Sequence, residues 1–168
     1  PVPNGTEKPV EKKLSAFSTI PGTKYLIAGI VVSDDYGSLD FSAREFGSYG
    51  FVVYNYVFFD IASETYHPLL PDNNQLIIEK TGLPVCCNYT EDDPVVGWLY
   101  AIVKADTNND GILSSEDRFT IAMSDAGGNG YVELIQDVEA DLGKNTPDDS
   151  TLLVFYRRYA ADAGADAA

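Results

Sequence analysis

Short runs of β-branched and aromatic residues, separated by turn-forming residues, recur through the middle of this sequence. Val, Ile, Tyr and Phe favour extended strands because their side chains pack well on a pleated surface. Clusters of Asp, Asn, Gly and Pro lie between the runs, and these residues favour tight turns. The sequence therefore predicts an all-β fold of antiparallel hairpins. We expect its strands at Tyr25–Val32, Phe51–Ile61, Gln75–Glu79, Val95–Val103, Phe119–Met123, Tyr131–Ile135 and Leu152–Tyr156.

Helical periodicity is almost missing from the chain. Only Glu133–Leu142 hints at a short helix, which Gly143 would end. The length of 168 residues fits one domain, at about 100 to 200 residues per domain. Both ends lack the apolar bulk that a packed element needs. We expect a flexible N-terminal segment at residues 1–13, a single β domain at 14–159 and a disordered tail at 160–168.

The net charge excludes several classes of partner. Eleven Lys and Arg stand against 26 Asp and Glu, which gives −15 at pH 7. Such a surface repels nucleic-acid phosphates and anionic lipid headgroups, so we expect neither as a partner. The longest strongly apolar run, Leu26–Val32, is far shorter than the roughly 18 residues of a membrane-spanning helix. We therefore expect no transmembrane segment.

The segment Asp106–Asp117 fits a template for a calcium-binding loop. That template places oxygen-bearing side chains at loop positions 1, 3, 5 and 12, Gly at position 6 and an apolar residue at position 8. Gly111 and Leu113 stand at the last two of these positions. Ca²⁺ needs six to eight oxygen ligands at about 2.3 to 2.6 Å, so the chain must curl around the ion. The predicted ligands are Asp106, Asn108, Asp110, the carbonyl of Ile112, Ser114 and Asp117.

This loop resembles the calcium loops of EF-hand proteins, and more closely those of dockerins, which also close with Asp. Both families flank the loop with helices, whereas Gly97–Val103 and Arg118–Met123 are rich in strand-forming residues. We therefore expect the loop at the tip of a β-hairpin. A dockerin also carries a second copy of the loop, which this chain lacks, so the resemblance does not imply cohesin binding.

Calcium is expected to stabilise the fold rather than to switch it. Without an ion, Asp106, Asp110 and Asp117 would repel one another, and binding removes that cost. Three carboxylates with a short closing side chain suggest dissociation constants of about 10⁻⁴ to 10⁻³ M, which are typical of extracellular modules. The polar segment Pro1–Lys13 also looks like a tether left after removal of a signal segment. We expect an exported protein of the periplasm, cell envelope or extracellular space, such as a processed lipoprotein.

Two segments 65 residues apart repeat a short pattern. In Val57–Leu70 and in Ile121–Ile135, an apolar strand ends at an Asp, a polar turn follows, and a Leu stands nine residues after the Asp. The unit resembles the outer hairpin of a blade in TolB-like bacterial β-propellers. This resemblance implies a partial propeller-like arrangement, although a two-sheet sandwich fits as well. An open set of blades would leave edges for a second chain, so a homo-oligomer is also possible.

The signals for an enzyme are weak. The only histidine, His67, is expected at the surface, and no nucleophile, zinc or nucleotide-binding motif occurs. Acidic residues in turn signals could converge as a glycosidase pair, although a solvated face is the simpler interpretation. These residues are Asp34, Asp35, Glu64, Glu91, Asp92 and Asp93. The cysteines Cys86 and Cys87 are adjacent, which rules out a multi-disulfide scaffold and favours free thiols.

These patterns together favour a calcium-binding, non-catalytic exported protein that acts in binding or as a scaffold. The partner would be a protein or a carbohydrate, because tyrosines crowd around Tyr49, Tyr54 and Tyr56 and could line such a face. Two alternatives stay open. One is a carboxylate-dependent glycan hydrolase, and the other is a calcium-dependent adhesion module.

Overall fold

A computed structural model describes residues 11–32, 53–85, 92–148 and 150–159. This described part contains ten β-strands and no helix. The strands are β1 (Lys12–Leu14), β2 (Ser18–Thr19), β3 (Tyr25–Val32), β4 (Val53–Asp60), β5 (Thr65–Pro68), β6 (Leu76–Leu83), β7 (Gly97–Val103), β8 (Phe119–Asp125), β9 (Val132–Asp148) and β10 (Thr151–Arg158). The predicted all-β class is therefore confirmed.

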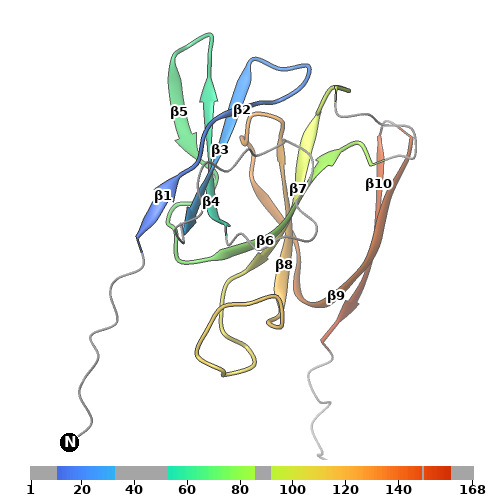
Figure 1. The fold of residues 1–168 in the computed structure, drawn as a ribbon. Helices are drawn as coiled ribbons and strands as arrows, with labels where there is room; N and C mark the ends of the chain where they lie inside the picture. The colour runs from blue at the N-terminus through green and yellow to red at the C-terminus, as the bar shows by residue number, and fades with distance from the viewer. Residues whose placement is uncertain (1–10, 33–52, 86–91, 149, 160–168) are drawn as a thin grey trace, which may run out of the picture.

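All the strands belong to one continuous antiparallel sheet, which folds back on itself (Figure 1). Its order is β1-β3-β4-β6-β7-β8-β9-β10, and β2 and β5 add to β3 and β4 respectively. Most neighbours in space are also neighbours in sequence, as expected for a chain of hairpins. The repeated segments around Asp60 and Asp125 both form hairpins, β4–β5 and β8–β9. Their relation to propeller blades stays a prediction.

The hint of a helix at Glu133–Leu142 is wrong, because these residues belong to the long strand β9. The first part of β9 pairs with β8 and the second part pairs with β10, so hydrogen bonds to two partners hold it extended. At the other end of the chain, β1 begins at Lys12, within the predicted N-terminal segment 1–13. Residues 1–10 and the predicted tail lie outside the described residues, as do Cys86 and Cys87.

Strand β9 bends sharply and carries the chain from one layer of the molecule to another (Figure 1). Asp137 and Gly143 adopt positive φ angles of 57° and 132°, and the register shifts on both sides of the strand. The far end of β9 then reaches the segment that follows β6: the backbone N–H and hydroxyl of Thr146 both donate to the carbonyl of Val85. The hairpin β9–β10 thus lies across one face of strands β6–β8.

Strand β7 is the centre of the fold, because every one of its residues is buried. Side chains alternate along a strand, so its two faces build two separate cores. Trp98, Tyr100 and Ile102 contribute to the first core, which we call the N-terminal core because β3 and β4 form its other wall. The residues between them contribute to the second core, which we call the C-terminal core because β9 and β10 cover it.

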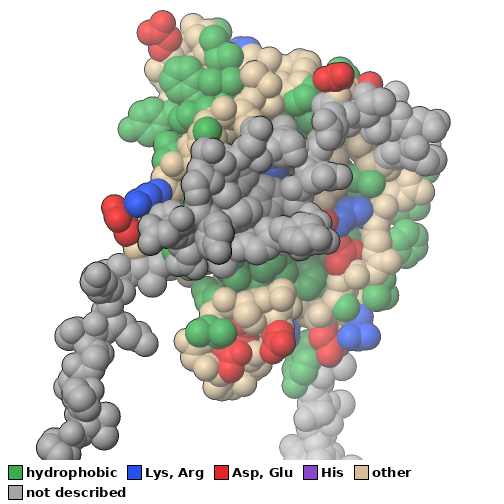
Figure 2. Space-filling view, in the orientation of Figure 1, with side chains coloured by type: hydrophobic (Ala, Val, Ile, Leu, Met, Phe, Trp, Pro, Cys, Tyr) green, Lys and Arg blue, Asp and Glu red, His purple; other side chains and the backbone are tan. Residues whose placement is uncertain are grey.

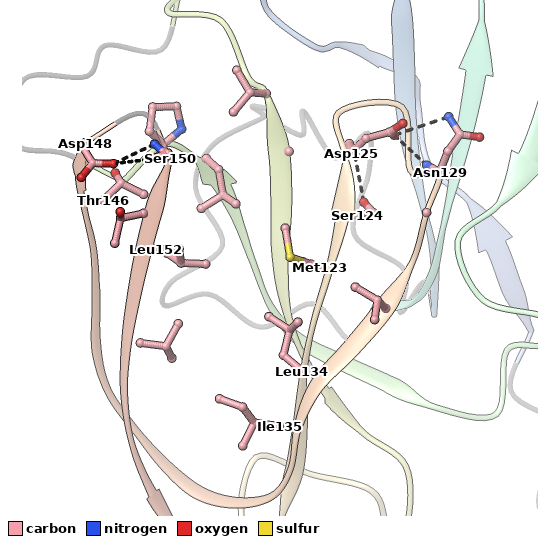
Figure 3. Close-up of a pocket in the computed structure, with 18 residues that line it drawn as sticks. Met123, Ser124, Asp125, Asn129, Leu134, Ile135, Thr146, Asp148, Ser150 and Leu152 are labelled. Carbon is pink, nitrogen blue, oxygen red and sulfur yellow. Dashed lines mark hydrogen bonds between the residues drawn. The ribbon is translucent and has the colours of Figure 1, made fainter.

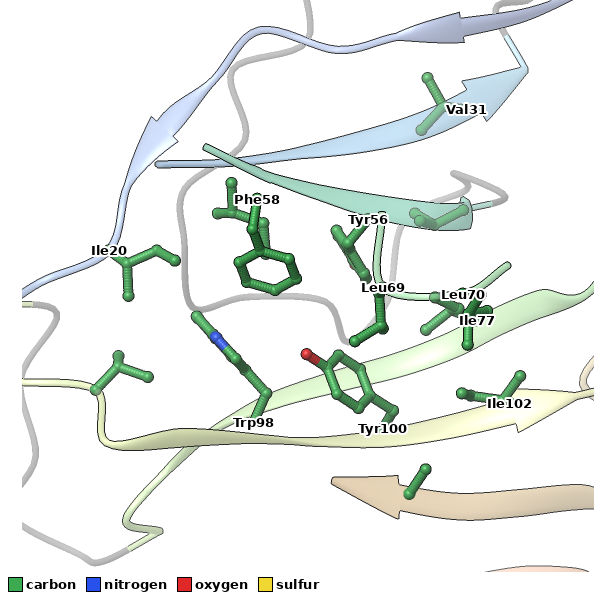
Figure 4. Packing of buried hydrophobic residues seen from close by; sticks show 14 residues of the cluster. Ile20, Val31, Tyr56, Phe58, Leu69, Leu70, Ile77, Trp98, Tyr100 and Ile102 are labelled. Atoms are coloured by element: carbon green, nitrogen blue, oxygen red, sulfur yellow. The ribbon is translucent and has the colours of Figure 1, made fainter. Parts of the chain in front are cut away.

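The N-terminal core is buried and rich in aromatic rings, among them Phe58, Trp98 and Tyr100 in Figure 4. Its buried members are Ile20, Ile27, Val31, Val53, Tyr56, Phe58, Leu69, Leu70, Ile77, Val95, Trp98, Tyr100, Ile102 and Ala122. Its buried polar groups have partners. The side-chain amide of Asn55 donates from Nδ2 to the carbonyl of Leu70 and accepts at Oδ1 from the N–H of Leu70, both at 2.9 Å. The hydroxyl of Tyr100 meets that of Ser124 at 2.9 Å.

The C-terminal core is smaller and mostly aliphatic. Its buried members are Leu76, Leu83, Leu99, Ala101, Val103, Phe119, Ile121 and Val138. Partly buried residues of the β9–β10 hairpin, which we call the outer hairpin, pack against it, including Ile135, Leu152 and Val154. The two-layer packing on each side of β6–β8 is sandwich-like, in line with one of the two predicted arrangements.

Candidate functional site

The predicted calcium loop forms the tip of the β7–β8 hairpin. The two strands pair along their whole length, from Gly97 with Asp125 to Val103 with Phe119, so the loop closes the hairpin as the sequence predicted. Leu113 packs against the C-terminal core, as expected for the apolar loop position. Acidic side chains gather over this loop at the lower edge of the molecule (Figure 2).

Asp106, at the first position of the loop, organises the turn. Its Oδ1 accepts hydrogen bonds from the N–H groups of Asn109 at 2.7 Å and Asp110 at 3.2 Å. Its Oδ2 accepts from the N–H of Gly111 at 2.8 Å. Asn109 and Gly111 have positive φ angles of 62° and 90°. Gly111 thus supplies the sharp turn that the template requires, because glycine adopts this conformation without strain.

The middle of the loop is held by short-range contacts among its polar residues. The amide of Asn108 donates from Nδ2 to Oδ2 of Asp110 at 3.1 Å. Oδ1 of Asp110 accepts from the N–H of Ile112 at 3.0 Å, while the side chain of Ile112 is exposed. The hydroxyl of Ser114 accepts from the N–H of Glu116. All the predicted ligands therefore lie on one folded loop.

Asp117 closes the loop and is almost fully buried, with 2% of its surface exposed. Its Oδ1 accepts hydrogen bonds from Thr107 and Asn108, and its Oδ2 accepts from the N–H of Ser114 at 3.0 Å. These donors, with Ser114 the strongest, hold the pKa of Asp117 below its usual range. The carboxylate is therefore ionised at neutral pH and fixed in place.

The donors of this loop fit a hard cation, although the carboxylates do not converge. Every predicted ligand atom is an oxygen, which is the donor type that Ca²⁺ prefers. Among the residues that the structure describes, no three acidic, His or Cys side chains come together as a metal cluster. An ionised carboxylate has about four lone-pair sites, and two hydrogen bonds reach Asp110. Asp110 therefore retains acceptor capacity.

No ion pair within the described residues compensates the negative charge of the loop. Lys104 and Arg118 flank the loop, but they pair with carboxylates of β9: Lys104 with Glu133, and Arg118 with Asp137 at 3.5 Å. None of the ion pairs within the described residues involves an aspartate of the loop. An added cation would therefore meet an uncompensated negative field.

The histidine considered as a catalytic base has a structural environment. His67 stacks on Phe58 with ring centres 5.8 Å apart. Its Nε2 lies 3.0 Å from the carbonyl of Gly127, and its Nδ1 lies 3.2 Å from the carbonyl of Pro68. Both ring nitrogens therefore face backbone carbonyls. The ring links β5 to the turn between β8 and β9.

The acidic residues considered as a glycosidase pair are only partly described. Asp34, Asp35 and Glu91 lie outside the described residues. Glu64 is exposed in the β4–β5 turn at a φ of 56°, and Asp92 is exposed in the segment before β7. These two side chains therefore sit on turns, as the sequence indicated.

A cavity that the sequence did not predict lies between the outer hairpin and the C-terminal core. Its volume is about 860 Å³, and its wall comes from the ends of β6 to β8 and from β9 and β10. Leu152 of β10 faces Met123 and Leu134 across the space (Figure 3). Two acidic residues, Asp125 and Asp148, also line it. No local sequence pattern points to this cavity, because its walls come from segments that lie far apart in the chain.

No helix within the described ranges has the length and apolarity needed to cross a membrane. Comparisons of the chain with protein-family models, with curated proteins and with solved structures found no match.

Proposed function

We propose that this protein is a non-catalytic binding or scaffold protein whose β7–β8 loop binds calcium and stabilises the fold. The observation that carries the proposal is the loop itself: a hairpin tip with an all-oxygen set of ligands, whose aspartates take part in no ion pair of the described residues. The proposed ligands are the side chains of Asp106, Asn108, Asp110, Ser114 and Asp117 and the carbonyl of Ile112.

Calcium would act through the two ends of the loop. Asp117 is held by backbone donors at the start of the loop, so it already joins the two ends. Asp106 is likewise fixed by three N–H groups of the turn. Because the carboxylates do not converge in this structure, a bound ion would have to draw them together, and it would offset their repulsion and order the loop further. Because Leu113 packs against the C-terminal core, an ordered loop would also stabilise that core.

The calcium affinity expected for such a loop suits an environment rich in calcium, so the proposal includes an exported location. A bound ion in a hairpin tip has no helix pair to open, and this favours a structural role over a regulatory one. A calcium-dependent adhesion module would share the same ion site.

The glycan hydrolase receives less support. Asp125 and Asp148 line the same cavity, but each accepts hydrogen bonds from its own turn. The N–H of Ser150 holds the pKa of Asp148 below its usual range. A general acid needs a raised pKa, so this environment opposes that role for Asp148.

Thermal unfolding with calcium, with magnesium and with chelator tests the proposal. At about 10 mM calcium, a dissociation constant of about 10⁻⁴ to 10⁻³ M predicts a rise in Tm of about 3 to 10 °C. Asp110→Ala should abolish the rise. Glu116→Ala is the matched control, because it removes an acidic side chain of the same loop that is not a proposed ligand. Equal shifts with calcium and magnesium, or none, would contradict the calcium site.

A further inference from the structure

We propose that the cavity binds an extended strand of a partner protein, with apolar residues at alternate positions and neutral or basic residues between them. The inference rests on the proposed binding role but not on calcium. The strand would add to the open edge of the sheet and fill the cavity with its apolar side chains. This mode of recognition uses main-chain hydrogen bonds for affinity and side-chain pockets for specificity.

The first argument is that two strand edges border the cavity. Strand β10 ends the order of the sheet and pairs only with β9 in the described part of the chain. The segment Val132–Ile135 of β9 pairs with β8, and no second partner is found for it among the described strands. Residues of both edges line the cavity. Edge strands present unpaired N–H and C=O groups, which another strand can satisfy.

The second argument is that the cavity has the size and lining for alternate apolar side chains. Its volume of about 860 Å³ lies within the usual range of ligand sites, roughly 300 to 1,000 Å³. Leu152 and Val154, two residues apart on β10, both line it. Val132 and Leu134 of β9 also line it and remain 46% and 44% exposed. An added strand would bury these side chains.

The third argument is electrostatic and sets the chemistry of the partner. The charged residues in the described lining are Asp125 and Asp148, and no Lys or Arg lines the cavity there. Their own turns fix both carboxylates in position. The whole chain carries a net charge of −15. A neutral or basic strand is therefore favoured, whereas an acidic strand, a fatty acid or a second copy of this acidic chain is disfavoured.

Selection from a random peptide library tests this inference. Peptides of about ten residues, the length of a long strand, are selected on the full chain. Leu134→Lys and Leu142→Lys are a matched pair: both leucines lie on β9 and are exposed, at 44% and 63%, but only Leu134 lines the cavity. Affinities of an enriched peptide, synthesised with Lys or with Glu between its apolar residues, are then measured by calorimetry.

We expect enriched peptides with alternating apolar residues. Leu134→Lys should weaken binding by about tenfold or more, whereas Leu142→Lys should leave it nearly unchanged. The Lys peptide should bind more tightly than the Glu peptide, and amide exchange along β10 should slow in the complex. No enrichment, peptides without alternation, or equal binding to both variants would overturn the inference.

Two further outcomes would also overturn it. Binding of a long-chain alcohol without peptide enrichment would assign the cavity to a small apolar ligand. A dimer of the wild-type chain that Leu134→Lys dissociates in sedimentation would assign the cavity to a second copy. Peptide binding is measured both with calcium and with chelator. If calcium fails to raise the Tm but the peptide still binds, the result counts against the ion site and not against the strand site.

Discussion

The two faces of strand β7 contrast sharply, although each is buried. One face carries Trp98 and Tyr100 into the N-terminal core, where large rings fill the space and buried polar groups have partners. The other face carries Leu99 and Ala101 into the C-terminal core, which is also buried, but the residues of the β9–β10 hairpin that pack against it are only partly buried and border a large cavity. Under the strand-binding proposal, the N-terminal core maintains the fold, and the side of the C-terminal core leaves room for the partner strand.

The largest expected effect comes from opening the closed core. Trp98 is fully buried and donates from Nε1 to the carbonyl of Ala126 at 3.0 Å. Trp98→Ala should lower the free energy of unfolding by about 3 to 5 kcal/mol, because it leaves a void that cannot collapse. Leu152→Ala should cost less than about 2 kcal/mol, since Leu152 already borders a cavity. Urea unfolding measures both, and equal costs would remove the contrast between the cores.

The next effect concerns the buried polar groups. Asn55→Ala should cost about 1 to 3 kcal/mol, because the N–H and carbonyl of Leu70 lose their partner inside the N-terminal core. Thr146→Val, at the outer hairpin, should cost only about 0.5 to 1.5 kcal/mol, since the backbone N–H of Thr146 still bonds Val85. Chemical denaturation measures the loss in free energy of unfolding for both variants. A larger loss for Thr146→Val than for Asn55→Ala would contradict this prediction.

Lys80 gives the closed core a pH dependence. Its burial lowers its pKa from 10.5 to about 7, and its ammonium group lies 4.1 Å from the ring centre of Trp98. Between these two pKa values the unfolded chain holds more protons than the folded one, so the free energy of unfolding rises with pH. We expect a rise of about 2 kcal/mol from pH 7 to 9.

Lys80→Met should remove this rise, which unfolding at several pH values would show. Above about pH 10 the trend should reverse, because burial raises the pKa of Tyr56 and Tyr100 and ionisation then favours the unfolded chain. A variant that keeps the full rise would assign the pH dependence to other groups.

The smallest effect should come from the edge of the open cavity. Leu134→Lys should change the free energy of unfolding by no more than about 0.5 kcal/mol, because the side chain is already 44% exposed. Urea titration checks this value. A large loss of stability would mean that Leu134 belongs to the packed core rather than to a binding surface.

The sequence predicted the parts of the fold that local chemistry determines. Strand-forming runs such as Tyr25–Val32 and Phe119–Met123 became β3 and β8, and the turn around Gly111 became a hairpin tip. Each of these features depends on residues close together in the chain. Local propensity and turn residues were therefore enough to predict them.

The rest depends on contacts between distant residues. Within β9, the region Glu133–Leu142 has a faint helical spacing, but pairing with β8 and β10 holds it extended. Its bend near Asp137 and its return to Val85 join segments far apart in the sequence. The cavity arises from that bend, and no local pattern marks a space that side chains leave empty. The sequence proposed ligands for the loop but could not show how their hydrogen bonds are arranged.

Residue-resolved amide hydrogen exchange tests the division between the two cores most directly. Amides of β3, β4 and β7 around the N-terminal core should exchange only through global unfolding. Amides of β10 and of the end of β9 should exchange through a local opening that requires less free energy, and Leu134→Lys should leave this pattern unchanged. Equal protection of the β9–β10 hairpin and of β3–β4 would contradict the account, because the outer layer would then be as firmly closed as the inner one.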